Sequence, residues 1–438
     1  MTTDIEKKPF FSDSIRLFQT FNIVRQIAVI GGSIILAKSA MSLTNIGNFE
    51  TLNFLGQFMS IFWVNGLNQA FLSIYPKVSD SQKNTFISSV FLLFLIASLF
   101  FSILLVLGKN LLLPFLIEAR YIEGLYWFAL YSFANVPAIL IPSILLLRNN
   151  SGELLRFTIF YFVGYVTVFI LNFLLGGQLI NLLILLNVFA FSLLGLSGII
   201  SIKPNFNLVS RKWLKRLLLI GSPLIGYSIL AGLAPLFDNW LVQRLYDDKA
   251  MFAIYRYGAR EFPLTMTLAI GLGTSLLPTI SNDLQRGLAQ LKLRASRLYP
   301  ITFGTSILLI IGSKYLFPIV FSSDFVASAP IFNIFLLIII SRMIYPQSII
   351  LALKRTRILL YISIIELFVN VVASFLLGMK FGLIGIAYGT VIAFTVEKLL
   401  QMWYLKWKYR LHPADYTSLG KFALYSLGLV IAFLLWGS

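Results

Sequence analysis

The chain has 438 residues, of which 58% are hydrophobic and 12% are charged, and its formal net charge is +18. Soluble domains carry about 25% charged residues, so this composition excludes an ordinary soluble protein. The chain has no cysteine and one histidine, His412, which excludes disulfides and thiol catalysis and argues against a metal site or catalytic triad built on histidine.

Long apolar runs predict thirteen membrane-spanning helices. A spanning helix needs roughly 20 mostly apolar residues to cross about 30 Å of hydrocarbon. These runs are continuous, which favours helices over the short alternating strands of a β-barrel. The first ten residues are polar, so we expect no cleavable signal peptide. The predicted segments are 17–40, 53–76, 86–108, 124–147, 156–176, 179–202, 216–238, 252–280, 298–320, 328–352, 358–378, 382–405 and 419–437.

The placement of lysine and arginine predicts the orientation. With the N-terminus in the cytoplasm, the cytoplasmic loops hold about 23 of these residues and the outer loops about six, as the positive-inside rule predicts. The cations are spread over many loops, so we expect no nucleic-acid partner. One cytoplasmic loop, 282–298, has leucines at helical spacing among basic residues. This pattern predicts a short amphipathic helix on the anionic inner leaflet, with a plain charged loop as the alternative.

Similar features recur in the two halves of the chain. Residues 73–79 and 275–281 both read Ser-x-x-Pro-x-(Val/Ile)-Ser. Pro142 and Pro346 lie near the cytoplasmic ends of the fourth and tenth predicted segments. Asn172 and Asn370 each precede a glycine-containing turn in the fifth and eleventh. Six helices are an even number, so both copies enter the membrane from the same side and form parallel repeats. We therefore predict an all-α, polytopic membrane protein with two six-helix bundles around a central cavity and a probable thirteenth helix. The predicted domains are an N-terminal bundle at 1–205, a C-terminal bundle at 206–410 and the additional helix at 411–438.

One arginine lies deep in its segment. Arg342 is about twelve residues from Pro330 and from Lys354, near the bilayer centre, where a charge costs roughly 2.5–3.5 kcal/mol on insertion scales. Such residues usually face a cavity or a partner. We expect Arg342 to face a polar lumen, and the alternative is a buried ion pair with Glu366 or Glu397.

Other charges lie nearer the ends of their segments. Arg256 and Arg260 are four residues apart, so they share one face of a continuous helix. For this pair the alternative is snorkelling to the interface. Arg25 belongs to a polar stripe, which favours the cavity, whereas Lys38 is as well placed for snorkelling as for function. The adjacent Glu397 and Lys398 have an interfacial alternative.

A lumen with cations at several depths suits an anion, and guanidinium groups suit phosphate because they bind it through planar, bidentate contacts. The sequence has no phosphate-binding ATPase loop, so we expect a driving force from an H+ or Na+ gradient or from the membrane potential, and no cofactor. The substrate-binding candidates are Arg25, Lys38, Arg256, Arg260 and Arg342. The ion-coupling candidates are Asp238, Glu261, Glu366 and Glu397.

Four groups of residues form a pattern along the chain: Lys38 with Ile46, Gly47 and Phe49; Gly66 and Leu67 with Pro76; Asp238 and Asn239 with Ala253, Ile254, Tyr255 and Ala259; and Asn370 with Gly378, Gly382, Gly385, Ala387 and Gly389. Through these groups the chain resembles, over roughly residues 15–408, the polysaccharide (O-antigen, Wzx-type) flippases of the multidrug/oligosaccharidyl-lipid/polysaccharide exporter (MOP) superfamily. A thirteenth helix departs from the twelve or fourteen that are usual there. Related lipid II flippases use cavity arginines on helices one and eight, where Arg25 and Arg256 or Arg260 fall here.

The resemblance implies a monomeric flippase, not an enzyme, in the bacterial cytoplasmic membrane. Its substrate would be an undecaprenyl-pyrophosphate-linked oligosaccharide, moved across the bilayer by alternating access for surface polysaccharide synthesis. Its partners would be the lipid bilayer and the polysaccharide polymerase machinery. The main alternative is an ion-coupled multidrug exporter of the same superfamily. A membrane glycan ligase or polymerase is the weaker alternative, because the predicted outer loops are short.

Overall fold

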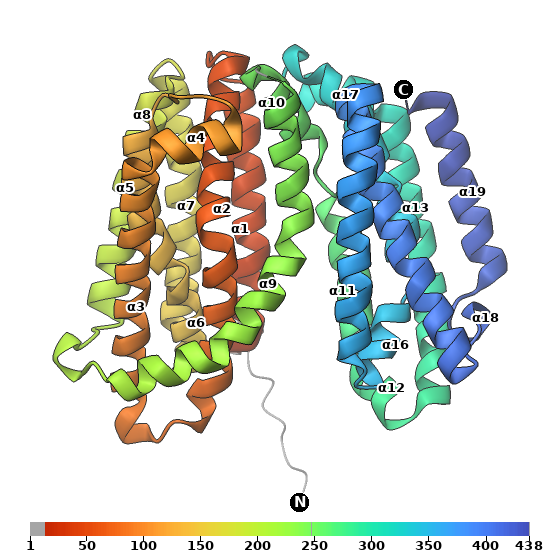
Figure 1. The fold of residues 1–438 in the computed structure, drawn as a ribbon, viewed down its shortest axis with the longest axis horizontal. Coiled ribbons are helices and arrows are strands. Elements are labelled where there is room, and N and C mark those ends of the chain that lie inside the picture. Colours follow the sequence, from red (N-terminus) through yellow and green to blue (C-terminus); the bar gives the residue numbers. More distant parts are fainter. Residues whose placement is uncertain (1–13, 247, 438) are drawn as a thin grey trace, which may run out of the picture. The chain divides into compact units, whose positions relative to one another are not determined.

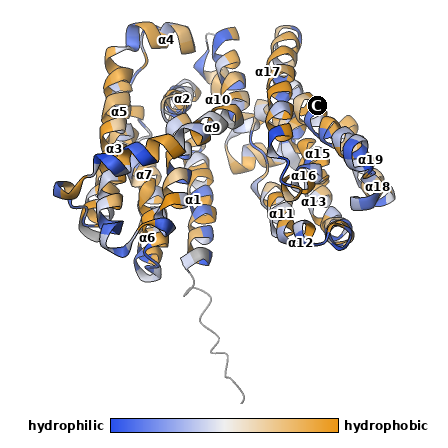
Figure 2. Cartoon of the chain, turned by 60° about the horizontal axis from the view of Figure 1, so that its bottom comes forward, coloured by the Kyte–Doolittle hydropathy of each residue, from blue (hydrophilic) through white to orange (hydrophobic). Residues whose placement is uncertain are grey.

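The computed structural model describes residues 14–246 and 248–437, and across these ranges every regular element is a helix (Figure 1). This confirms the predicted all-α fold. Eleven helical stretches in the described ranges are long and apolar enough to cross a membrane, and Figure 2 shows hydrophobic residues along most of the helices. Twelve of the thirteen predicted segments overlap these stretches, since two of them lie within Thr356–Tyr409, whereas the predicted segment 53–76 lies in a helix that is not among the eleven.

The chain packs into two compact units, residues 1–232 and 233–438. The domain boundaries predicted from the sequence stay predictions. In the first unit the regular elements are α1 (Ser14–Ala37), α2 (Leu43–Ile74), η2 (Tyr75–Lys77), α3 (Asp80–Leu107), α4 (Lys109–Ile117), α5 (Leu125–Ala138), α6 (Leu140–Leu147), α7 (Ser151–Leu174), α8 (Leu179–Ser192), the π-helix η3 (Leu193–Ser201) and η4 (Phe206–Leu208). Helix α9 (Arg211–Leu245) starts in the first unit and ends in the second.

Aromatic side chains fill the core of the first unit. Phe71, Phe86 and Phe94 are fully buried. The Phe86 ring lies 5.1 Å from that of Trp213 in α9, and the Phe94 ring lies 5.2 Å from that of Trp63 in α2. These contacts tie α2, α3 and the first part of α9 together. Large apolar side chains also cover the outside of α3 and α4, as expected for helices that face lipid.

The second unit contains the end of α9 and eleven further elements. They are α10 (Lys249–Gly258), α11 (Pro263–Ser275), α12 (Leu277–Asn282), α13 (Leu284–Val320), η5 (Ser323–Ser328), α14 (Ala329–Leu336), α15 (Ile338–Arg342), α16 (Pro346–Ala352), α17 (Thr356–Tyr409), α18 (Pro413–Tyr416) and α19 (Leu419–Trp436).

Two segments predicted as single helices are broken in the second unit. Pro263 and Pro346 each stand at the first position of a new helix, α11 and α16. A proline has no backbone N–H to continue the preceding helix, and it pushes the residue before it out of the helical region. Phe262 is accordingly extended, with φ −66° and ψ 116°. The breaks leave residues 259–262 and 343–345 outside any helix.

Helix α17 is a hairpin of two helical arms that reverse at Gly382, where φ is 65° and ψ is −142°. Residues with a side chain rarely adopt this backbone conformation. Past the turn the arms touch backbone to backbone. A Cβ atom on Gly385 would overlap the Leu377 carbonyl, and one on Gly389 would overlap Ser374. Small residues therefore allow the close approach of the two arms, which correspond to the predicted segments 358–378 and 382–405.

The predicted amphipathic helix at 282–298 is the first part of α13, whose N-terminus is capped by Asp283. Its leucines do not lie on a leaflet, because the structure buries Leu288 and Leu291 in the protein core. Lys292 donates a hydrogen bond to the Ala414 carbonyl at 2.6 Å, so α18 covers this part of the helix. The prediction of a surface helix was therefore wrong, since the apolar stripe packs on neighbouring helices.

The last helix belongs to the second unit. Leu429 and Ala432 of α19 lie in its hydrophobic core. The fully buried Asn333 side chain of α14 donates one hydrogen bond to the Gly437 carbonyl at 3.2 Å and another to the Ser313 hydroxyl at 2.9 Å. A buried polar bond thus fixes the end of α19 to two other helices.

Candidate functional site

The two proline breaks bring opposite charges together. Glu261 lies in the break between α10 and α11, and Arg342 is the last residue of α15. Arg342 Nη2 donates to Glu261 Oε1 at 2.7 Å, and Nε donates to Oε2 at 3.2 Å. Two parallel contacts of this kind form a bidentate ion pair, which fixes orientation as well as distance. The carboxylate bound to Arg342 is therefore Glu261, and the pairing with Glu366 or Glu397 that the sequence left open was wrong.

The guanidinium group of Arg342 is held on one edge and one face. Its centre lies 4.8 Å from the ring centroid of Phe394, which stands on the second arm of α17. This geometry is a cation–π contact. The side chains of Arg342 and Glu261 are 22% and 23% exposed. The pair is therefore mostly, but not fully, buried.

Arg256 and Arg260 lie beside the same break. Arg260 Nε donates to the Arg256 carbonyl at 3.1 Å, and its guanidinium lies 4.6 Å from the Tyr257 ring. Helix α10 ends at Gly258, so Arg260 does not share a helix face with Arg256 as predicted. Both side chains are half-buried and make further contacts. Arg260 and Glu261 thus lie in the break after α10, and Arg256 lies in the last turn of that helix.

A second charged group lies on the second arm of α17. Glu397 Oε2 is 3.0 Å from Lys398 Nζ, and Lys398 is only 5% exposed. Gln401 donates to Glu397 at 2.7 Å, and Lys398 donates to the amide oxygens of Gln347 and Gln401 at 3.4 Å. The predicted interfacial alternative is wrong for Lys398, because its ammonium is buried in a hydrogen-bonded network. Glu366 is half-buried on the first arm.

Asp238 lies in a buried cluster of oxygen atoms. Its side chain is 3% exposed, and Thr390 donates a 2.6 Å hydrogen bond to its Oδ2. The side chains of Ser374 and Asn370 interact with the same carboxyl group. Both are fully buried, and both Asp238 Oδ1 and Asn370 Oδ1 are buried without a hydrogen-bond partner. Buried polar atoms normally have partners, so these two oxygen atoms are exceptions.

The first unit holds the other two predicted substrate contacts. Arg25 is half-buried on α1, with its guanidinium 6.0 Å from the Phe21 ring. Lys38 is exposed and follows the last residue of α1. The exposed position of Lys38 leaves both the snorkelling and the functional interpretations open.

Sequence reasoning missed one buried carboxylate. Glu50 of α2 is only 4% exposed and has an interaction partner. The prediction began the second helix at residue 53 and so placed Glu50 in a loop. In the structure the helix begins at Leu43, where the Ser42 hydroxyl accepts a hydrogen bond from the Asn45 backbone N–H. A serine followed by a long helix is a typical N-cap signal that could have found it.

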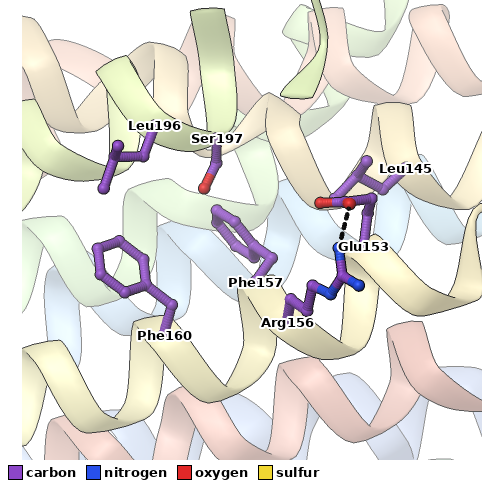
Figure 3. Close-up of a pocket in the computed structure, with 7 residues that line it drawn as sticks. All are labelled: Leu145, Glu153, Arg156, Phe157, Phe160, Leu196 and Ser197. Carbon is purple, nitrogen blue, oxygen red and sulfur yellow. Dashed lines mark hydrogen bonds and ion pairs between the residues drawn. The ribbon is translucent and has the colours of Figure 1, made fainter. Parts of the chain in front are cut away.

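A groove of about 170 Å³ lies in the first unit beside the π-helix (Figure 3). Phe157, Phe160 and Leu196 make up much of its apolar lining. The Arg156 guanidinium binds Glu153 at 2.8 Å within the same helix, and the two side chains are 79% and 31% exposed. None of the predicted substrate or ion residues lines this groove.

The described ranges contain no group of three or more His, Asp or Glu residues that could hold a metal ion. The Asp238 cluster instead combines one carboxylate with amide and hydroxyl oxygens. Hard cations prefer such oxygen ligands. A single negative charge suits a monovalent cation better than a divalent one.

A comparison with protein-family models finds no match, and neither does a search of curated proteins. Solved structures do match, over nearly the whole chain. The lipid II flippase MurJ, in an inward closed conformation, has a TM-score of 0.66 at 20% identity, covering 96% of this chain and 92% of that one. An inward-facing multidrug resistance MATE transporter of the MOP superfamily has a TM-score of 0.62 at 14% identity, covering 91% and 98%. A MOP superfamily transporter from Pyrococcus furiosus has a TM-score of 0.56 at 13% identity, covering 91% of this chain and 95% of that one.

The chain has the fold of MOP-superfamily transporters. The matched structures are membrane transporters and a flippase rather than enzymes. At these identities the likeness establishes the MOP fold alone. The substrate has to be argued from the residues of this chain.

Proposed function

We propose that this protein is a flippase that moves an undecaprenyl-pyrophosphate-linked oligosaccharide from the inner to the outer leaflet of the bacterial cytoplasmic membrane. The observation that carries the proposal is the bidentately held, partly exposed guanidinium of Arg342 at a break between helices. Arginine binds phosphate through a planar fork, and the low dielectric of a membrane protein strengthens the contact. The neighbouring Arg256 and Arg260 add positive charge on α10 and in the adjoining break.

Two features of the whole chain support a lipid-linked substrate. The protein consists of helices suited to a bilayer, and the structurally similar MurJ is named as a lipid II flippase. A pyrophosphate group attached to a lipid would meet the arginines at membrane depth. Alternating access of two bundles around a cavity, a monomeric state, the inner-membrane location and a role beside polysaccharide polymerases belong to the same proposal.

An ion-coupled multidrug exporter is the second candidate, because MATE transporters have a similar fold. The charge of the site opposes it. A cationic drug that approached the helix breaks would be repelled by Arg256, Arg260 and Arg342. The carboxylate there that could attract it, Glu261, is already paired with Arg342. Like charges at this depth are costly, so a cationic drug is a poorer ligand than an anion.

We propose Asp238 as the residue that binds the coupling ion, with Na+ as the first choice and H+ as the second. The two buried oxygen atoms without partners, on Asp238 and Asn370, support this assignment. Glu261 is already bound to Arg342, and Glu397 is bound to Lys398. Those two carboxylates and Glu366 are weaker candidates because none of them has a comparable set of neutral oxygen ligands around it.

The test replaces Arg342 by Lys and by Ala in proteoliposomes loaded with a fluorescent undecaprenyl-pyrophosphate oligosaccharide. A charge-assisted hydrogen bond contributes about 1.5–3 kcal/mol, so Arg342→Ala should slow translocation by about tenfold or more. Arg342→Lys keeps the charge opposite Glu261 but lacks the fork, and we expect an intermediate rate. The measurement is the rate at which the label becomes accessible in the second leaflet.

The matched control is Arg156→Ala, which removes another arginine paired with a glutamate and should leave translocation within twofold. Its exposed pair contributes about 0–1 kcal/mol, so the fold should tolerate its loss. Translocation at the wild-type rate in correctly folded Arg342→Ala protein would rule out Arg342 as the phosphate-binding residue, and no translocation by the wild type would rule out the flippase assignment. Transport of a cationic dye by the wild type, with no movement of the lipid, would favour the exporter.

A further inference from the structure

We infer that Glu261 is a positioning residue for Arg342. It holds one edge of the guanidinium group so that the opposite edge is presented to a phosphate oxygen pair. This inference rests on the proposed function for the identity of the ligand. It concerns the carboxylate, which the sequence offered only as an ion-coupling candidate, and assigns it to substrate binding.

The contact geometry divides the guanidinium into two edges. Glu261 accepts from Nε and from one hydrogen of Nη2. The other edge consists of Nη1 and the second hydrogen of Nη2, and this edge has no hydrogen-bond partner among the residues that the structure describes. It forms a second fork of the same width, which matches two phosphate oxygens. The Phe394 ring covers one face and limits rotation of the group.

The backbone around Glu261 holds the carboxylate in place. Glu261 is two residues before Pro263, which starts α11, and the Arg260 N–H donates to the Gly258 carbonyl at 2.8 Å. Its partner is the last residue of a short helix that ends before another proline break. An arginine held this way has already lost its rotamer freedom before the ligand arrives. Preorganisation of this kind improves affinity because less order has to be imposed on binding.

A carboxylate next to an arginine also acts against an anion, since it neutralises part of the positive charge. The two roles predict opposite effects for Glu261→Gln. If Glu261 positions the arginine, the substitution removes one of two acceptor oxygens and weakens phosphate binding. If Glu261 competes with the phosphate, the substitution removes the competitor and strengthens binding.

The pair of Arg156 and Glu153 serves as a matched control (Figure 3). Its 2.8 Å contact is nearly as short as the 2.7 Å contact of Arg342 with Glu261. It differs in that its residues are three apart on one helix and the Arg156 side chain is 79% exposed. A change at Glu153 therefore reports the effect of losing a carboxylate without the loss of positioning.

The experiment measures binding of undecaprenyl pyrophosphate to the full-length protein in lipid nanodiscs. We expect Glu261→Gln to weaken binding by about tenfold and Glu261→Asp, which retains both oxygens, to lose less. Glu153→Gln should bind within twofold of the wild type. Tighter binding by Glu261→Gln, or unchanged binding, overturns the inference.

A charge swap separates positioning from simple stabilisation. The double variant Glu261→Arg with Arg342→Glu keeps an ion pair but moves the guanidinium to the other helix break. We expect it to recover the melting temperature lost in the single variants without recovering binding. Recovery of both would show that the pair acts only as a structural link and would overturn the inference.

The two proposals fail in different ways. If the wild type does not bind the pyrophosphate lipid, the proposed function and the inference fall together. If the wild type binds it and Arg342→Ala does not, the proposed function stands. In that case the Glu261 variants alone decide whether the carboxylate positions the arginine.

Discussion

For Arg342, the charge pattern of the sequence predicted a functional residue but not its partner. Its depth in an apolar segment identified it as a functional candidate, and Glu261 was identified separately as an acidic companion. The two residues are 81 positions apart, and they meet only because prolines end the helices beside them. Sequence reasoning treated both segments as continuous helices. It therefore counted residues along an unbroken helix and could not place the acid beside the base.

The Asp238 cluster was predictable in part. Asp238 and Asn370 both appeared in the motifs that carry the family resemblance. Ser374 and Thr390 gave no signal, because a serine or threonine inside an apolar helix usually bonds its own backbone. Their role follows from the hairpin of α17, which brings both arms against the end of α9.

The ion assignment predicts a residue-scale effect of sodium on stability. A ligand that binds only the folded protein raises its apparent stability. We expect sodium chloride, compared with choline chloride, to raise the melting temperature of the wild type. Asp238→Asn removes the charge at nearly constant volume and should abolish this shift.

Asp283→Asn is the control, because Asp283 caps α13 at an exposed position. It should keep the sodium response. A sodium-dependent shift that persists in Asp238→Asn contradicts the assignment of Asp238. If the melting temperature of the wild type changes with pH but not with sodium, the result favours a proton as the coupling ion.

At the scale of elements, hydropathy predicted segments that overlap all eleven candidate spans of the described ranges, and local chemistry decided where each helix begins and ends. The segment predicted at 53–76 begins ten residues earlier, at Leu43. The segment predicted at 252–280 is divided by Pro263. Apolar content is a property of the whole window, so it detects a helix without resolving a cap or a break.

The hairpin of α17 predicts different outcomes for two glycine substitutions. A methyl group on Gly389 would meet the backbone of Ser374, whereas one on Gly304 of α13 would meet nothing within 4 Å. Overpacking costs typically about 1–3 kcal/mol, so Gly389→Ala should lower the melting temperature clearly. Gly304→Ala should leave it equal or slightly higher, because alanine favours helix. Equal melting temperatures for the two variants would contradict the close contact of the arms.

For the whole molecule, the class of fold was predictable from the sequence, and the repeat of a six-helix unit stays a prediction. Asn172 and Asn370 are both fully or nearly fully buried, each in its own unit, as two copies of one design would require. The function could not be read at this scale. Structures with the same fold bear the names of a lipid flippase and of multidrug transporters, so the choice depends on a few charged side chains.

Thirteen spanning helices predict that the two ends of the chain lie on opposite sides of the membrane. With the N-terminus in the cytoplasm, alkaline phosphatase fused after Trp436 should be active, because the enzyme folds only outside the cytoplasm. The same enzyme fused after Ser210, between the sixth and seventh predicted helices, should be inactive. Activity in the second fusion, or none in the first, would contradict the predicted topology.

The second arm of α17 contacts both the Asp238 cluster and the Arg342 guanidinium. Thr390, which binds Asp238, and Phe394, which lies against Arg342, are four residues apart on one arm and so on the same side of it. No side chain at Gly385 or Gly389 cushions that arm against the other. The proposed ion-binding residue Asp238 and the Arg342 guanidinium therefore contact this arm one helical turn apart. A movement of this arm therefore changes the surroundings of Asp238 and of the Arg342 guanidinium together.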